Sequence, residues 1–223
     1  MTMERFSDAI ATFEHAMERA RQMVRLYDAL VALRPREPAN DDALRSAYFQ
    51  TVSSFDFFAH ELAAVEAMHR FQNAILTRNI TLPMEIITVQ NLEERTNAAD
   101  AYIRQANSFR AFVDPSKLAE VLSCYCCDPW LKLSGLINEN KDEAVLRSPE
   151  AIKGQLKSIW RRRNQIAHSA DVNPALAGIE LWPINKEDAE ITITFIEELG
   201  RHLPTVISQT LEDVQPHGNV SNK

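Results

Sequence analysis

The chain has 223 residues, of which 45% are hydrophobic and 25% are charged, and its formal net charge is −7. This composition is that of an ordinary globular protein, and its five glycines are too few for a Gly-rich all-β or phosphate-loop architecture. An acidic chain has no overall positive field that attracts nucleic acid or anionic membranes, so any such binding requires a local basic patch.

The termini and cysteines indicate a cellular setting. The N-terminus is polar, and no apolar run approaches the ~20 residues that span a bilayer, so we expect no signal peptide, no membrane partner and a cytoplasmic location. Cys124, Cys126 and Cys127 are crowded together without a second cluster. They are predicted to be reduced, partly buried thiols rather than a disulfide framework or a zinc site.

Two long amphipathic helices are predicted in the first third of the chain. Apolar residues at alternating steps of three and four predict a helix over residues 4–33 and a second over 41–76, which Asn40, Asp41 or Asp42 can cap. The inward stripe of the second helix consists of Leu44, Tyr48, Val52, Phe55, Ala59 and Leu62.

An acidic residue and a histidine, Asp56 and His60, lie beside that stripe, four residues apart on one helix face. Two interpretations are open for this pair. It either makes hydrogen bonds at the edge of the core, or it supports a functional site.

Shorter elements are predicted in the middle of the chain. Residues 79–89 surround a proline and form either a short strand or an extended connection. Helices are expected over 92–109 and over 115–125, the latter with Asp114 as its cap and a proline in its first turn. The tripeptide Asp128-Pro129-Trp130 has the same start signal and predicts a further short helix.

The C-terminal third is predicted to hold two more helices. The first begins at Ser148-Pro149 and runs to about His168, and the second covers residues 186–211, where Pro204 is expected to kink or break it. A loop over residues 171–182 joins them. The inward stripe of the last helix is predicted to hold Ile191, Phe195, Ile196, Leu199, Leu203 and Ile207.

No internal repeat or linker divides the chain. Residues 1–214 are therefore predicted to form one all-α domain, an up-and-down helical bundle, and residues 215–223 a disordered tail.

An arginine interrupts the apolar stripe of the helix that ends at His168. At about 100° per residue, Arg163 projects from the middle of the stripe that Ile152, Leu156, Ile159 and Ile166 form. An unpaired charge there costs several kcal/mol. Either a carboxylate such as Asp56 or Glu61 pairs with Arg163, or the stripe faces a subunit interface or cleft that a phosphate enters.

Polar and basic residues follow the flank of the same helix. Asn164 and His168 lie on one side together with Lys157, about 90° from the stripe, and His168 is about 140° from Arg163. Helix fraying, the reach of the arginine or a second copy of the chain is needed to bring these two together. Arg161 and Arg162 are expected on the outer face or a cleft rim, as solvated residues or as ligands, and His168 alone could simply cap the helix.

The residues of this helix have the chemistry for RNA cleavage without a metal. Histidine moves protons near neutral pH, arginine holds a phosphate through two hydrogen bonds, and asparagine orients either partner. The ribose 2′-hydroxyl is itself the nucleophile. No serine triad, Walker loop or metal-ligand spacing competes with this interpretation.

The hexapeptide from Arg163 to His168 resembles the Arg-x(4–6)-His signature of HEPN domains, in the form Arg-Arg-Asn-x-Ile-Ala-His-x-x-Asp of the RiboL-PSP-HEPN branch. Three further stretches, 49–62, 109–133 and 182–184, support this resemblance. Together they extend it over most of residues 40–200.

The resemblance implies a helical bundle that dimerises with its two motifs facing each other and, in many members, a metal-independent endoribonuclease without cofactors. Such proteins commonly serve in toxin–antitoxin modules or phage defence, which implies RNA, a second copy and an antitoxin or defence partner as binding partners. By position, Arg163, Asn164 and His168 are the expected catalytic residues. Substrate binding is expected of Lys157, Arg161 and Arg162, and a supporting role of Asp56, His60 and Asp171.

Some HEPN proteins do not cleave RNA, so the sequence leaves a second hypothesis open. In it, the chain is a non-catalytic HEPN module that binds RNA, a nucleotide or a partner protein through the same basic residues. A third hypothesis makes Arg163 a structural ion-pair partner without any ligand.

Overall fold

The structure is a computed structural model that describes residues 3–168, 171–173 and 180–209. Regular structure in these ranges is helical, apart from one isolated β-bridge between Val172 and Leu181. The α-helices are α1 (Ser7–Leu33), α2 (Asp41–Asn73), α3 (Met84–Ile87), α4 (Leu92–Asn107), α5 (Pro115–Leu122), α6 (Pro129–Asn138), α7 (Pro149–His168) and α8 (Lys186–Ile207). Short 3-10 turns, η1 (Glu4–Phe6), η2 (Pro38–Asn40) and η3 (Glu143–Val145), flank three of them. The predicted all-α class is confirmed.

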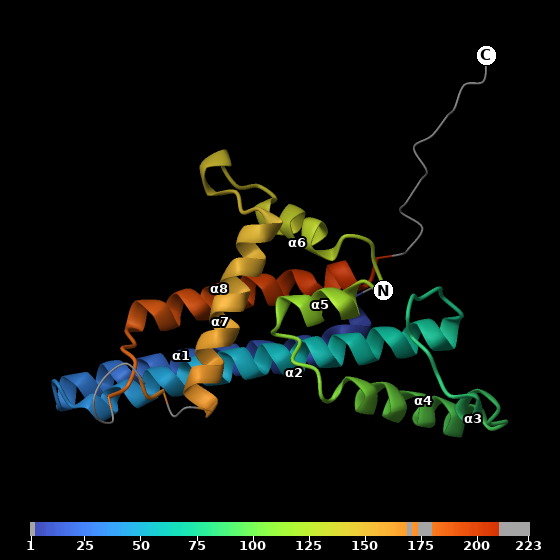
Figure 1. Ribbon diagram of the computed structural model, residues 1–223, viewed down its shortest axis with the longest axis horizontal. Helices are drawn as coiled ribbons and strands as arrows, with labels where there is room; N and C mark the ends of the chain where they lie inside the picture. The colour runs from blue at the N-terminus through green and yellow to red at the C-terminus, as the bar shows by residue number, and fades with distance from the viewer. Residues whose placement is uncertain (1–2, 169–170, 174–179, 210–223) are drawn as a thin grey trace, which may run out of the picture.

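The long helices form the frame of the molecule. α1 and α2 are an antiparallel hairpin, and α8 runs beside them in the direction of α2, whereas α7 crosses α2 steeply (Figure 1). The predicted up-and-down order therefore holds for α1 and α2 but not for α7. The crossing leaves α7 with one face on α2 and its flanks against α5 and α6.

Aromatic and aliphatic side chains fill the space between α1, α2 and α8. The rings of Phe13 and Phe58 stack with their centroids 4.5 Å apart. A Cβ atom at Gly200 would lie 2.4 Å from Phe13 Cε1, so glycine is what allows α8 to approach α1 this closely. All six residues of the predicted inward stripe of α2 are buried.

A buried ion cluster lies at the far end of α2. Glu66 accepts hydrogen bonds from Arg5 at 2.8 Å and from Arg70 at 2.6 Å. Arg70, which is 1% exposed, also donates to the carbonyl oxygens of Ile207 and Gln209 at the end of α8. The cluster pairs the buried Arg70 and the half-buried Arg5 with one carboxylate and ties α8 to α2.

Several local predictions need correction. Residues 79–89, predicted as a short strand or an extended connection, contain the one-turn helix α3, and Asn40 donates to the carbonyl of Arg34 rather than capping α2. Asp128 precedes α6 with a φ of 47° and makes no capping hydrogen bond. The helix α8 continues through Pro204, so the predicted break is wrong. Ile191, expected inside, is 49% exposed.

Other predictions are confirmed. Asp114 caps α5 with Pro115 in its first turn, and the three cysteines are free thiols, of which Cys126 is buried. None of the described helices combines the length and the apolar character that a membrane span requires. The predicted tail over residues 215–223 lies outside the described residues.

Candidate functional site

The helix α7 carries the predicted site, and its own sequence explains where it begins and which face it buries. Ser148 Oγ accepts a hydrogen bond from the amide of Ala151 at 3.1 Å, which caps the first turn as predicted. Ile152, Leu156 and Ile159 are buried, so the apolar stripe faces the core. The cap and the buried stripe together fix the direction in which each later residue of α7 points.

Arg163 is half-buried at the end of the stripe, where its guanidinium carbon lies 4.9 Å above the ring of Phe49 on α2. Its Nη1 donates to Asn164 Oδ1 at 3.2 Å, while its Nε is buried and makes no hydrogen bond to any described residue. Within the described ranges, no carboxylate lies within ion-pair distance of Arg163. The guanidinium therefore rests on an aromatic ring and is not neutralised.

The carboxylates proposed as partners of Arg163 are engaged elsewhere. Asp56 Oδ1 accepts a hydrogen bond from the amide of Val113 at 3.0 Å, and Glu61 pairs with Arg104 of α4. The prediction that one of these two forms a structural ion pair with Arg163 is wrong. Both lie on α2, where neighbouring loop and helix groups reach them first.

Asp56 and His60 hold the segment before α5 against α2. His60 Nε2 donates to the carbonyl of Arg110 at 2.9 Å, and its ring stacks on Phe112 with centroids 4.1 Å apart. Together with the bond from Asp56 to Val113, this is the edge-of-core role that the sequence left open. A direct role of this pair at the Arg163 site has no contact to support it.

Arg162 is bound by a buried carboxylate, which the sequence analysis did not foresee. Both oxygens of Asp171 accept from its two terminal nitrogens, and Oδ2 also accepts from Arg45 Nε at 2.7 Å. Asp171 is 1% exposed. The expected position of Arg162 on the outer face is therefore wrong, because Asp171 holds it in a charge-assisted pair.

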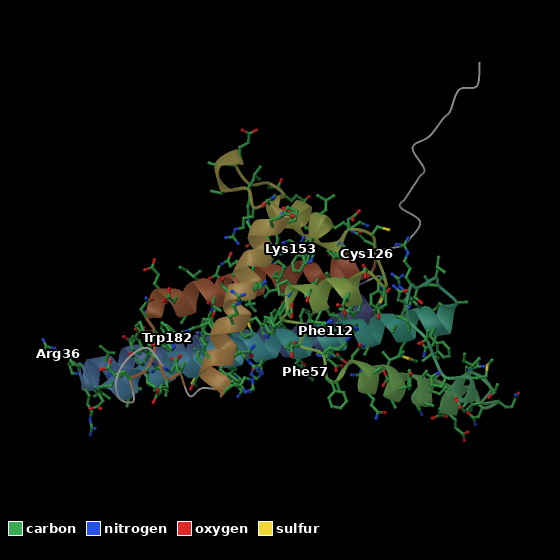
Figure 2. All side chains as sticks on the ribbon, in the orientation of Figure 1. Arg36, Phe57, Phe112, Cys126, Lys153 and Trp182 are labelled. Atoms are coloured by element: carbon green, nitrogen blue, oxygen red, sulfur yellow. The ribbon has the colours of Figure 1, made fainter. Side chains whose placement is uncertain are left out.

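Asp171 also shapes the chain after α7. Its φ is 60°, in the left-handed region, its amide donates to the carbonyl of Gln165 at 3.1 Å, and its own carbonyl accepts from the amide of Trp182 at 2.8 Å. Arg45 donates to the Trp182 carbonyl at 3.0 Å. In Figure 2, Trp182 is labelled in the half of the molecule where α2 begins. Asp171 thus supports the site indirectly, by fixing the backbone on both sides of the loop.

Burial affects one titratable group behind α7. Tyr48 lies in the core of α2 and its hydroxyl donates to the carbonyl of Ile159 at 3.4 Å. Burial raises the pKa of Tyr48 to about 12, although the positive charge of Arg162 acts to lower it. This tyrosine is a neutral packing partner of α7 and not a proton donor at neutral pH.

Three of the four remaining predicted residues are exposed. Lys157 and Arg161 lie on the solvent side of α7, Asn164 is half-buried, and His168 is the exposed last residue of the helix. No hydrogen bond joins Arg163 to His168 in the described part of the chain. Asn164 and Arg163 are brought together, while His168 is separate.

Sequence reasoning missed two aromatic residues next to these groups. Phe49 lies under Arg163, and Trp130, interpreted only as part of a helix start, forms a pocket wall beside Lys157. Phe49 has no visible signal because it lies off the buried stripe of α2. The only sequence signal for Trp130 is that it is a tryptophan, because its neighbour Lys157 on α7 is far away in the sequence.

No three His, Cys, Asp or Glu side chains of the described residues gather closely enough to hold a metal ion. No protein-family profile, curated protein or solved structure matches the chain. The chemistry of Arg163, Asn164 and His168 is therefore the basis on which a function can be argued.

Proposed function

We propose that the chain is a metal-independent endoribonuclease of HEPN type. The single observation that supports this best is the state of Arg163. Its guanidinium is half-buried against Phe49, and among the described residues its Nε has no hydrogen-bond partner and no carboxylate neutralises it. A cation held this way at the edge of an apolar wall is suited to bind a phosphate group.

The proposed reaction uses the RNA's own nucleophile. His168 removes the proton of the ribose 2′-hydroxyl, the 2′-oxygen attacks the adjacent phosphorus, and the bond from phosphorus to the 5′-oxygen breaks. The protonated His168 then gives its proton to the 5′-oxygen, which leaves a 2′,3′-cyclic phosphate and a 5′-hydroxyl and returns the histidine to its neutral form. Arg163 stabilises the negative charge that develops on the non-bridging phosphate oxygens, and Asn164, already hydrogen-bonded to Arg163, keeps the guanidinium oriented.

The proposed site includes a second copy of the chain. Arg163 and His168 are five residues apart on one helix, which separates them by about 140° around its axis. In a symmetric dimer, His168 of one protomer faces Arg163 of its partner. Roles in phage defence or as the toxin of a toxin–antitoxin pair are consistent with such an enzyme and belong to the proposal.

Purified protein tests the reaction directly. RNA incubated with the protein in excess EDTA is expected to be cut to fragments with 2′,3′-cyclic phosphate ends, and His168→Ala is expected to abolish the cutting. His15→Ala is the matched control, because His15 is an exposed histidine on α1, which carries none of the predicted site residues. Undiminished cleavage by His168→Ala contradicts the catalytic assignment.

A mixing experiment tests the second copy. His168→Ala and Arg163→Met proteins are each expected to be inactive alone, and their heterodimer is expected to regain activity because one composite site is then intact. If neither the wild-type protein nor the heterodimer cuts any RNA but both bind it, the non-catalytic HEPN module is the better description.

A further inference from the structure

A pocket of about 510 Å³ lies between α5, α6 and α7, away from the Arg163 site. Two tryptophans and two lysines line it: Trp130, Trp160, Lys153 and Lys157. Of the two tryptophans, Trp130 is buried and Trp160 is half-buried. In Figure 2, Lys153 is labelled on the first half of α7, on the side of α5 and α6.

The pocket lining holds two lysines and one aspartate, and of these Lys157 is the cation without a carboxylate partner among the described residues. Lys153 Nζ lies 5.9 Å from the centroid of Trp130 and 3.7 Å from Glu150, whose side chain is largely exposed. Lys157 makes no ion pair with a described carboxylate. Asp114 also lines the pocket, but its Oδ1 is engaged by the amide and hydroxyl of Ser116 at the start of α5. One lysine is therefore available.

One of the residues that line the pocket is a glycine, and no close contact with a neighbouring atom requires glycine at that position. Gly154 lies inside α7, where glycine weakens a helix, and a Cβ atom at this position would meet no atom within 4 Å. The backbone of α7 is thus exposed at this point of the pocket lining. This leaves room for a flat group to approach α7 beside Trp160.

The pocket and the proposed site share one flank of α7. Lys153, Lys157, Trp160, Asn164 and His168 follow one another at steps of four, three, four and four residues, so they form a continuous stripe. The eight residues from Trp160 to His168 correspond to a rise of about 12 Å. A single strand of a few nucleotides spans that distance.

We infer that this pocket binds one base of a single-stranded RNA, stacked against Trp160, with the adjacent phosphate on Lys157. Aromatic rings combined with lysines are the usual means by which proteins hold unpaired bases and their backbone. The identity of the ligand rests on the proposed ribonuclease function, because that function requires a single strand to pass His168. The pocket then determines which way the strand runs along α7.

The test measures binding without cleavage. A short fluorescein-labelled 2′-O-methyl oligoribonucleotide lacks the 2′-nucleophile, so its binding to the full chain is followed by fluorescence anisotropy. Gly154→Leu fills the pocket and is expected to weaken binding about tenfold, the effect of losing one stacked base. The same substitution is expected to raise the melting temperature by about 2 °C, because glycine disfavours the helix.

Gly135→Leu is the matched control. Gly135 is an exposed glycine in α6, a Cβ there also meets nothing within 4 Å, and it does not line the pocket. It is expected to stabilise the protein equally and to leave binding unchanged. Equal affinity of the wild-type, Gly154→Leu and Gly135→Leu proteins overturns the inference.

A second variant tests the phosphate contact. Lys157→Gln is expected to reduce the slope of log affinity against log salt by about 0.7, the contribution of one phosphate on a single strand. An unchanged slope overturns the assignment of Lys157. Free adenosine and uridine monophosphates are the competing ligands. If these monophosphates displace the oligonucleotide when both are present at the same concentration, the pocket binds free nucleotides and the single-strand inference fails.

The two proposals fail separately. If the wild-type protein cuts RNA and Gly154→Leu binds and cuts equally well, the ribonuclease function stands and the pocket inference is overturned. If no RNA is cut but Gly154→Leu binds the oligonucleotide about tenfold more weakly, the pocket inference is supported and the catalytic proposal fails.

Discussion

Arg162 and Arg163 are consecutive residues of α7 with opposite surroundings. Arg162 is held by both oxygens of the buried Asp171, which Arg45 also contacts at 2.7 Å. Arg163, about 100° further round the helix, rests on Phe49 and meets no carboxylate among the described residues. Two residues of the same type thus belong to two different regions, one closed and one open to a ligand.

This difference shows how the chain handles buried charge. Asp171 lies between two arginines near the start of α2, and Glu66 lies between Arg5 and Arg70 near its end. Each buried carboxylate is neutralised where elements distant in sequence meet. The uncompensated Arg163 departs from that rule, and such a departure is where function is expected.

Removing the shared carboxylate is expected to have the largest effect on this comparison. Asp171→Ala leaves Arg45 and Arg162 without a partner in a buried position, and we expect it to lower the free energy of unfolding by about 3–5 kcal/mol. Urea denaturation near neutral pH measures this. Asp42→Ala is the control, because Asp42 also pairs with Arg45 but its side chain is 66% exposed, so the loss is expected to be under about 0.5 kcal/mol. Equal losses would contradict the closed cluster.

Substituting the two arginines separately tests the comparison itself. Arg162→Met is expected to lower the free energy of unfolding by about 2 kcal/mol, since it leaves Asp171 with one arginine instead of two. Arg163→Met is expected to change it by only about 0.5 kcal/mol, yet to abolish RNA cleavage. Urea denaturation and the EDTA cleavage assay are run on both proteins. The reverse order of stability losses would show that Arg163 is the structural residue.

A double-mutant cycle between Phe49→Leu and Arg163→Met measures what holds Arg163. The ring and the guanidinium are expected to couple by about 1 kcal/mol, the size of a partly desolvated cation–π contact. Phe57→Leu replaces Phe49→Leu in the control cycle, because Phe57 is on the same helix and 55% exposed. Its coupling to Arg163 is expected to be close to zero. If the coupling between Phe49 and Arg163 is also close to zero, the ring does not hold the guanidinium.

The smallest expected effect is the contribution of Tyr48, in the core of α2, to the pH dependence of stability. Burial raises the pKa of Tyr48 from its ordinary value of 10.0 to about 12, so above about pH 10 the unfolded chain loses this proton before the folded one does. Stability is therefore lost as pH rises, and the part due to Tyr48 is about 0.8 kcal/mol between about pH 8 and pH 10.5. Tyr48→Phe is expected to remove that part of the alkaline loss, measured by urea denaturation at both pH values. An identical loss in both proteins would place Tyr48 in contact with solvent.

Local patterns were sufficient for most of the helices and for the unusual position of Arg163. The ends of α1, α5 and α7 were predicted within a few residues, because periodic apolar spacing, prolines and capping residues act over one or two turns. The rotation of 100° per residue placed Arg163 on a different side of the helix from Arg161 and Arg162, which could be predicted without knowing any contact. These features depend only on residues close in sequence.

Contacts between distant segments decided the rest. The partner of Arg162 comes from the loop after α7, the ring under Arg163 comes from α2, and Trp130 reaches the lysines of α7 from α6. Periodicity shows which side of a helix is buried but not which neighbour arrives there, because that depends on how α7 crosses α2 (Figure 1). The sequence therefore set Arg163 apart within the basic run, and only the packing of these helices made Arg162 a structural arginine and left Arg163 without a carboxylate among the described residues.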